Sequence, residues 1–230
     1  MNITLYHEEK GNKEPFILLH GNGEDGTYFT HQMDHFSDRY RMIAVDTRGH
    51  GKSPRGTAPF TIEQFSCDLN EFMTDLGIEK AVILGFSDGA NIAMKFAMKH
   101  PNKVKALILN GGNLNPRGVK RTVQVPIEIG YRIAKCFAFK SPDANKNAEM
   151  LGLMVNDPNI EPGELAQITA PTFVICGAKD MIKESHTKEI AKSIPQARLS
   201  IIEGDHFIAN KNYSMFNKEV EAFLQTIELA

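Results

Sequence analysis

The stretch "AVILGFSDG", residues 81–89, places a serine between two glycines directly after a run of apolar residues. A short branched aliphatic run is typical of a buried strand, and the following residues take on the spacing of a helix that ends before Pro101. A tight turn from strand to helix holds a serine in a strained conformation and lifts its hydroxyl clear of the sheet. Gly85 and Gly89 would keep side chains out of this crowded turn. The pattern favours Ser87 as a nucleophile over a serine in an ordinary turn.

Short apolar runs recur along the rest of the chain. They cover residues 16–19, 42–45, 81–84, 106–109, 173–175 and 199–202. The runs are continuous rather than alternating, as in parallel strands that are covered on both faces. Between two of them, an apolar stripe over residues 62–76 predicts a helix that Thr61 and Gln64 begin as a capping box and Gly77 ends. The sequence therefore predicts an α/β fold with a mostly parallel, doubly wound sheet flanked by helices.

Two segments stand apart from this alternation. We expect residues 3–8 to form an edge strand that pairs antiparallel with residues 16–19 across a polar turn. In residues 114–170, five prolines interrupt a patchy apolar pattern. Because a structureless connection of that length is rare in a compact domain, we expect a helical insertion there. The core would then consist of residues 1–113 and 171–230.

Composition narrows the functional class. A length of 230 residues fits one domain. The formal net charge is -2 and the chain has no long run of like charges, so its charge does not indicate binding to nucleic acid or to an anionic membrane. Three cysteines are too few and too scattered for a disulfide scaffold or a zinc site. The first ten residues lack the basic start and apolar core of a signal peptide, so we expect none, and no apolar stretch reaches membrane-spanning length. We expect a cytoplasmic monomer or homodimer that acts on a small molecule, and no metal or organic cofactor is implied.

A serine nucleophile needs a general base, which is usually a histidine. Residues that meet at one edge of a parallel sheet must follow the carboxyl ends of its strands. His206 follows the apolar run 199–202 and meets this condition. Other histidines occupy polar, surface-like contexts: His7, His31, His35 and His186. His206 is therefore the predicted base, the alternative being an ordinary loop histidine.

The base in turn needs a carboxylate that fixes its tautomer and stabilises its charged form. Asp180, just past the apolar run 173–176, is the predicted partner. Asp205 is the rival, although adjacent residues in an extended loop tend to point apart. In some related architectures the acid follows the preceding strand, where this chain offers only Asn110 and Asn113.

Acyl transfer also needs two donors for the tetrahedral oxyanion. One is expected from the backbone amide of Asp88, which follows the nucleophile at a helix N-terminus. The other is expected from the backbone amide of Asn22 in the loop "HGNG", residues 20–23, where Gly21 and Gly23 allow close approach. Alone this loop could be any glycine turn, but its position ahead of GFSDG makes it a specific indication of an oxyanion-binding loop.

The motifs HGNG, GFSDG, GAKD and GDHF, in this order and with DTRGHGKS at residues 46–53, resemble the α/β-hydrolase fold superfamily. The resemblance covers nearly the whole chain outside the insertion. It implies the chain order serine, acid, histidine, and it places residues 114–170 where that family carries a variable cap. It also implies that DTRGHGKS, with His50, is a structural turn. Ser87 separates this chain from members that need an aspartate there, such as haloalkane dehalogenases and epoxide hydrolases.

Within that superfamily, GFSDG and GAKD are most similar to biphenyl hydrolase-like, or valacyclovirase-type, esterases. In that group the acid after the nucleophile helps to receive a substrate amino group, which for Asp88 would favour amino-acid esters. Alternatively, Asp88 stabilises the N-terminus of its helix. The apolar residues of the insertion are expected to be walls of the substrate pocket or the cap's own core: Ile127, Ile129, Tyr131, Ile133, Phe137, Met150 and Met154.

Together the motifs predict a carboxylesterase-like serine hydrolase of small esters, with thioesters, lactones and amino-acid esters as related substrates. Ser87, His206 and Asp180 would form the catalytic triad, and Asp88, Ile127, Tyr131 and Met154 would contact substrate. Two alternatives remain. One is carbon–carbon bond hydrolysis of vinylogous diketones by the same triad, and the other is a ligand receptor that keeps the triad but turns over slowly.

Overall fold

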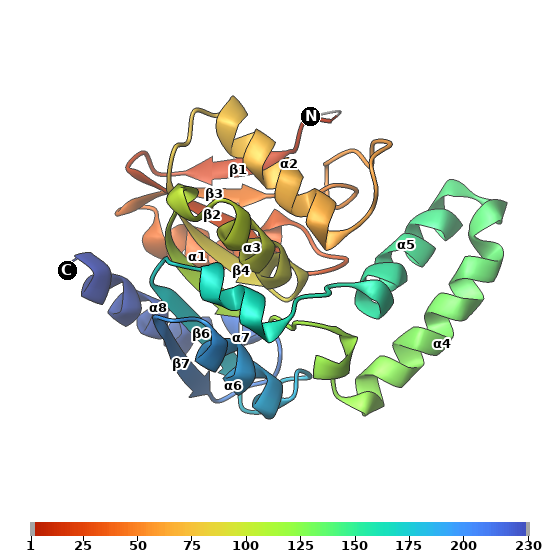
Figure 1. Cartoon of the computed structure of the whole chain (residues 1–230). Helices are drawn as coiled ribbons and strands as arrows, with labels where there is room; N and C mark the ends of the chain where they lie inside the picture. The colour runs from red at the N-terminus through yellow and green to blue at the C-terminus, as the bar shows by residue number, and fades with distance from the viewer. Residues whose placement is uncertain (1–2, 229–230) are drawn as a thin grey trace.

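Seven strands form a single sheet in the order β1-β3-β2-β4-β5-β6-β7 (Figure 1). The computed structural model describes residues 3–228, so the outermost residues of the predicted core, 1–2 and 229–230, lie outside it. The strands are β1 (His7–Lys10), β2 (Glu14–Leu19), β3 (Tyr40–Val45), β4 (Ala81–Phe86), β5 (Val104–Asn110), β6 (Thr172–Gly177) and β7 (Ala197–Ile202). β2 to β7 run parallel to one another, which confirms the predicted mostly parallel α/β sheet.

The first strand differs from its prediction in position and in partner. β1 begins at His7, and it pairs antiparallel with β3, with His7 opposite Val45. The predicted partner, β2, pairs with β3 on one side and with β4 on the other. Because a strand has only two hydrogen-bonding edges, β2 has none left for β1. The predicted pairing of residues 3–8 with residues 16–19 is therefore wrong.

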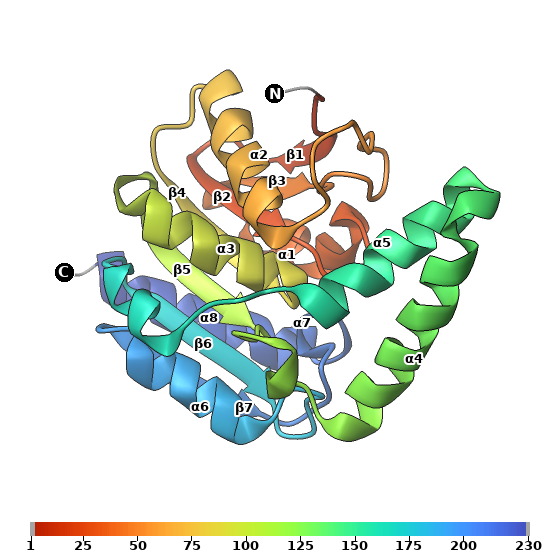
Figure 2. The ribbon, with the colours of Figure 1, turned by 45° about the vertical axis from the view of Figure 1, so that its right-hand side comes forward.

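Helices cover both faces of the sheet, which explains why its strands are apolar on both sides (Figures 1 and 2). One face carries α2 (Ile62–Asp75), α3 (Asp88–Lys99) and α6 (Glu184–Ser193), and the other carries α1 (Thr30–Phe36), α7 (Ile208–Lys211) and α8 (Tyr213–Glu228). Along β2, Ile17 and Leu19 pack into the first layer, whereas Phe16 and Leu18 pack into the second. The predicted doubly wound arrangement is confirmed.

The predicted helix over residues 62–76 is present as α2, with one difference at its start. The Thr61 hydroxyl accepts the Gln64 amide at 3.1 Å, and Gly77 follows the helix with a φ of 65°. The Gln64 side chain, however, donates to Asp68 at 2.9 Å instead of returning to Thr61. The Asp68 carboxylate one turn along fixes the Gln64 side chain as a donor, so only the first half of the predicted capping box is present.

Arg48 and Asp68 form a buried ion pair that anchors the loop after β3 to α2. Arg48 Nε and Nη2 donate to the two carboxylate oxygens at 2.7 and 2.6 Å, and both side chains are at most 2% exposed. His50 lies in the same loop, where its ring stacks on Phe60 and its Nδ1 lies 3.0 Å from the Arg48 carbonyl. These contacts give the DTRGHGKS segment the structural role that its resemblance implied.

Arg48→Met should lower the free energy of unfolding by about 3–5 kcal/mol, because it leaves the Asp68 carboxylate buried without its counter-charge. Urea unfolding followed by circular dichroism measures this loss. Arg41→Met is the matched control, since Arg41 also binds Glu9 through two hydrogen bonds, but with side chains 29% and 30% exposed. That variant should lose no more than about 1 kcal/mol. Equal losses in the two variants would contradict the role assigned to burial.

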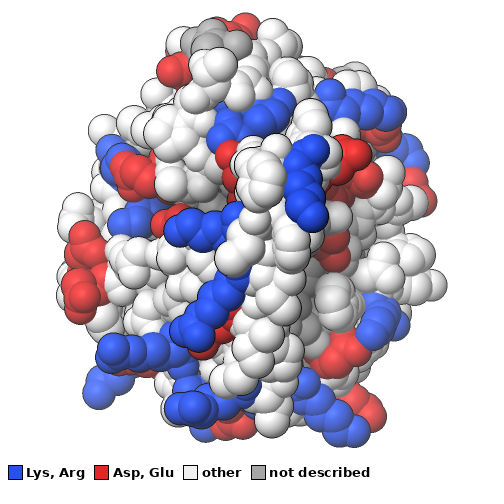
Figure 3. All heavy atoms as spheres, turned by 90° about the vertical axis from the view of Figure 1, so that its right-hand side faces the viewer, with Lys and Arg blue, Asp and Glu red and all other residues white. Residues whose placement is uncertain are grey.

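Residues 114–170, which we call the cap, form a helical segment beside the sheet (Figure 2). It contains α4 (Arg121–Phe137) and α5 (Pro142–Asn156), and Figure 3 looks onto this side of the molecule. Two polar contacts connect α5 to the rest of the protein: Arg55 binds Glu149 at 2.6 and 2.8 Å, and Asn22 Nδ2 donates to the Met150 carbonyl at 2.7 Å. Leu153 of α5 also packs into the main apolar core. The ends of the cap pack into the main apolar core through Leu114, Ile160, Leu165 and Ile168.

No helix within residues 3–228 combines the length and the apolar character needed to cross a bilayer. In the same range, no group of three or more His, Cys, Asp or Glu side chains is arranged to hold a metal ion.

Candidate active site

Ser87 lies in the turn between β4 and α3, with φ 53° and ψ -117°. Among residues 3–228 it is the only non-glycine residue with a positive φ, a conformation that a side chain disfavours. A methyl group on Gly85 would collide with the Gly89 carbonyl, and one on Gly89 would collide with the Leu19 carbonyl. The turn therefore requires both glycines, as the sequence predicted.

His206 follows β7 and reaches the Ser87 hydroxyl. Its Nε2 lies 3.0 Å from Ser87 Oγ, and its Nδ1 lies 2.7 Å from Asp180 Oδ1. The imidazole is buried against the ring of Phe86, with 4.8 Å between ring centroids. Asp180 is buried as well, and the same oxygen accepts the Ile182 amide at 2.8 Å. A carboxylate on Nδ1 favours the tautomer whose Nε2 can accept the serine proton, so the three groups form one hydrogen-bonded chain.

The other residues considered as partners of His206 point away from its ring. The Asp205 carboxylate accepts the Phe207 amide at 2.9 Å and binds Lys211, so it turns away from the imidazole beside it. Asn110 donates its side-chain amide to the Ile175 carbonyl at 3.3 Å. Asn113 takes part in a side-chain network with Asn91. Of the predicted candidates, the structure brings only Asp180 to His206.

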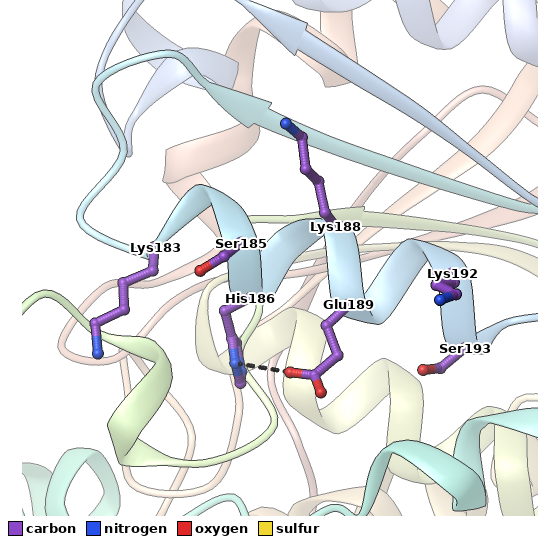
Figure 4. Close-up of a pocket in the computed structure, with 7 residues that line it drawn as sticks. All are labelled: Lys183, Ser185, His186, Lys188, Glu189, Lys192 and Ser193. Carbon is purple, nitrogen blue, oxygen red and sulfur yellow. Dashed lines mark ion pairs between the residues drawn. The ribbon is translucent and has the colours of Figure 1, made fainter.

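His186 is not the surface histidine that its polar surroundings predicted. Its side chain is 10% exposed, and its Nε2 accepts the Leu114 amide at 2.9 Å. Burial lowers the pKa of His186, which favours the neutral ring that this hydrogen bond requires. The prediction failed because His186 shares the inner face of α6 with Ile190, four residues on. The hollow of about 700 Å³ beside it lies along α6, and Ser87, His206 and Asp180 do not line it (Figure 4).

The two predicted oxyanion donors lie on either side of the nucleophile's turn. Asp88 is the first residue of α3, so its amide belongs to the N-terminal group that has no partner within the helix. Asn22 lies in the loop after β2, and its side-chain amide is held by the Met150 carbonyl of the cap. This contact uses one of the two Nδ2 hydrogens of Asn22, and the predicted role concerns its backbone amide. That the two amides bind an oxyanion remains a prediction.

The Asp88 carboxyl group is buried beside the nucleophile. Its Oδ1 accepts from Asn91 at 3.2 Å, and its Oδ2 has no hydrogen bond among the described residues, with the Asn22 side chain nearby. Burial raises the pKa of Asp88 to about 6, and Asp157 adds to that effect. A buried carboxylate with a free oxygen can bind a donor or a cation that enters the site.

Glu24 is a residue of the site that the sequence analysis missed. It is half-buried, and its Oε2 accepts the Gly21 amide at 3.2 Å. Burial raises the pKa of Glu24 to about 7, and the carboxylate acts electrostatically on His206. Its position in the loop that carries HGNG was the available signal, because a residue two places beyond Asn22 stays near the same edge of the sheet.

That Tyr131 contacts substrate remains a prediction. Tyr131 lines a hollow of about 470 Å³ between the cap and the core, with Phe60 and Asp157, but Ser87, His206 and Asp180 do not line it. Ile127 and Met154 are half-buried and do not line that hollow, so their contact with substrate remains a prediction. Three of the predicted apolar residues are exposed rather than packed in a cap core: Ile129 is 53%, Ile133 56% and Phe137 47% exposed. They are exposed because α5 covers only one side of α4.

Comparison with known proteins agrees with this architecture. The family described as alpha/beta hydrolase fold matches residues 14–129, and the chain belongs to this family. The "Putative carbamate hydrolase RutD" of Caulobacter sp. (strain K31) is 27% identical over 96% of this chain and 95% of its own length. A 2-hydroxy-6-oxononadienedioate/2-hydroxy-6-oxononatrienedioate hydrolase of Paraburkholderia phymatum is 30% identical over 82% of this chain and 64% of its own. The crystal structure of the enol-lactonase from Burkholderia xenovorans LB400 superposes with a TM-score of 0.81 at 23% identity, over 96% of each chain. The protein is thus similar to hydrolases of several kinds.

Proposed function

We propose that the protein is a serine hydrolase that cleaves small carboxylic esters through an acyl-enzyme. The observation that carries this proposal is the hydrogen-bonded chain from Ser87 through His206 to Asp180, with distances of 3.0 and 2.7 Å. The buried ring and carboxylate keep this chain in one geometry. Membership of a hydrolase family supports the same reaction class.

In the proposed reaction, His206 Nε2 takes the proton of Ser87 as Oγ attacks the ester carbonyl. The amides of Asn22 and Asp88 hold the oxyanion of the tetrahedral intermediate. The bond from carbon to the alkoxy oxygen then breaks, and His206 gives its proton to the departing alcohol. A water molecule, deprotonated by His206, releases the acid and restores the serine. Asp180 stays ionised and stabilises the imidazolium during both formation and hydrolysis of the acyl-enzyme.

Two carboxyl groups beside the triad bear on the class of ester. Asp88 and Glu24 both act electrostatically on His206, so ionised substrates must approach a site with acidic neighbours. Such a site repels anions and favours neutral or cationic esters. The relative named as a dioate hydrolase acts, by that name, on a doubly acidic compound. The acidic surroundings therefore favour ester cleavage over carbon–carbon cleavage of a dianion.

Labelling with a fluorophosphonate, followed by a panel of esters that differ in acyl size and charge, tests the proposal. We expect covalent labelling of Ser87 and repeated turnover of small neutral esters. Failure of the label to react would count against the nucleophile. Labelling without turnover of any ester in the panel would favour the slow receptor, and rapid turnover of a ring-cleavage diketone would favour the carbon–carbon hydrolase.

The preference for cationic esters should depend on pH through Asp88. Because the pKa of Asp88 is about 6, its carboxylate forms as the pH rises past that value. A quaternary-ammonium ester and its neutral carbon isostere share the same triad, so pH effects on the chemical step common to both cancel in the ratio of their kcat/KM values. We expect this ratio to rise by about fivefold as the pH passes 6.

Asp88→Asn should abolish the part of that rise near pH 6 and leave the part near pH 7, where Glu24 ionises, whereas Asp205→Asn should preserve both, since Asp205 is already paired with Lys211. A ratio that stays flat with pH in the unmodified protein would contradict the role of Asp88 in receiving a cation. It would favour the alternative in which Asp88 only stabilises the N-terminus of α3.

A further inference from the structure

The helix α4 presents an apolar stripe to solvent. Val125, Ile129, Ile133 and Phe137 follow one another at four-residue steps, so they share one side of the helix, and they are 37%, 53%, 56% and 47% exposed. Phe139, just past the helix, is 84% exposed. A continuous exposed apolar stripe of this kind marks an interaction surface rather than ordinary surface variation. We call these five residues the α4 stripe.

The surroundings of the α4 stripe are basic. Residues 120–140 contain five basic residues against one acidic residue, Glu128. The basic residues are exposed, and none forms an ion pair with another described residue: Lys120, Arg121, Arg132, Lys135 and Lys140. Figure 3 shows uncharged surface running down the middle of this face with Lys and Arg side chains beside it. This local excess of positive charge contrasts with the net charge of -2 of the whole chain.

The combination of the two features identifies the kind of partner. Pairing of two copies through the α4 stripe would bring the two sets of basic residues together with only one Glu128 each to offset them. A nucleic acid would use the positive charges but leave five large apolar side chains uncovered. An anionic lipid surface satisfies both, because apolar side chains enter the boundary of the acyl region while Lys and Arg remain at the headgroups.

We propose that the α4 stripe docks the protein on anionic lipid bilayers, with α4 lying in the plane of the interface. The proposal departs from the expectation of no membrane partner, which was based on the charge of the whole chain. It goes beyond the proposed hydrolase function and does not depend on it. The cap is thereby the side of the protein that faces the lipid.

Co-sedimentation of the full chain with vesicles tests this proposal. We expect binding to vesicles of phosphatidylcholine and phosphatidylglycerol to be about tenfold stronger than binding to pure phosphatidylcholine, and to weaken as ionic strength rises. Ile129→Glu combined with Ile133→Glu should remove binding to both kinds of vesicle. Arg132→Glu combined with Lys135→Glu should remove the preference for the anionic vesicles.

Matched controls separate the stripe from general surface effects. Leu199→Glu combined with Ile201→Glu changes two apolar residues of β7 that are each 37% exposed, and it should leave binding intact. Lys188→Glu combined with Lys192→Glu changes two lysines of α6, and it should leave the preference for anionic vesicles intact. Far-UV circular dichroism and melting temperature show that each variant is folded. No binding of the unmodified protein to anionic vesicles, or an equal loss in the controls, would overturn the proposal. A dimer in light scattering that the Ile129 and Ile133 variant converts to a monomer would overturn it as well.

Discussion

An alanine at position 87 should lower kcat/KM for a small aryl ester by about four to six orders of magnitude. Without the hydroxyl no acyl-enzyme can form, and only the oxyanion donors and substrate binding remain to accelerate attack by water. The loss should not come from unfolding, because alanine carries the same Cβ as serine into the turn at φ 53°. Initial rates over a range of enzyme concentrations, with the melting temperature measured in parallel, give both quantities.

Ser185→Ala is the matched control, since Ser185 is an exposed serine on α6. It should retain normal activity and normal labelling by a fluorophosphonate. If Ser87→Ala kept near-normal esterase activity, the assignment of the nucleophile would be wrong, whatever the geometry around His206.

Asp180→Asn should have the next largest effect, a loss of about four orders of magnitude in kcat. The Asp180 carboxylate accepts at His206 Nδ1 over 2.7 Å, which leaves Nε2 free to take the serine proton. An asparagine can instead donate to Nδ1, and the proton then sits on Nε2, where it blocks transfer from Ser87. Steady-state kinetics on the same aryl ester measures the loss, and the Ser87 label should slow to a similar degree.

Asp205→Asn distinguishes the two acids that neighbour the base. Its carboxylate binds the Phe207 amide and Lys211, so removing its charge should change kcat little. A larger loss in Asp205→Asn than in Asp180→Asn would mean that the working enzyme uses the other acid.

Much of the fold could be predicted because buried strands appear in the sequence as continuous apolar runs. Strands covered on both faces must be apolar at every position, and the runs around Ile17, Ile43 and Ile83 are. The partner of β1 could not be predicted, because pairing with β3 instead of β2 depends on which edge of the sheet is open. No residue in β1 itself carries that information.

The positions of the site residues could be predicted where each residue directly follows the end of a strand. Ser87, His206 and Asp180 were placed in this way. Contacts that depend on helix phase or on the cap could not be predicted. His186 looks polar in sequence yet faces inward from α6, and Asn22 meets Met150 across 128 residues of chain. Glu24 was missed because its raised pKa comes from burial, which its own sequence context does not show.

Because the ends of the cap are buried in the main apolar core, they determine where the cap can be exchanged for the cap of another protein. Leu114, Ile160, Leu165 and Ile168 are part of the same apolar cluster as the central strands. A chimaera joined at residues 114 and 170 would exchange part of that cluster together with the helices. Joints nearer to the ends of α4 and α5 would exchange the two helices and only Leu153 of that cluster. A different cap joined there would leave the interior of the scaffold packed, provided that it supplies an apolar side chain in place of Leu153.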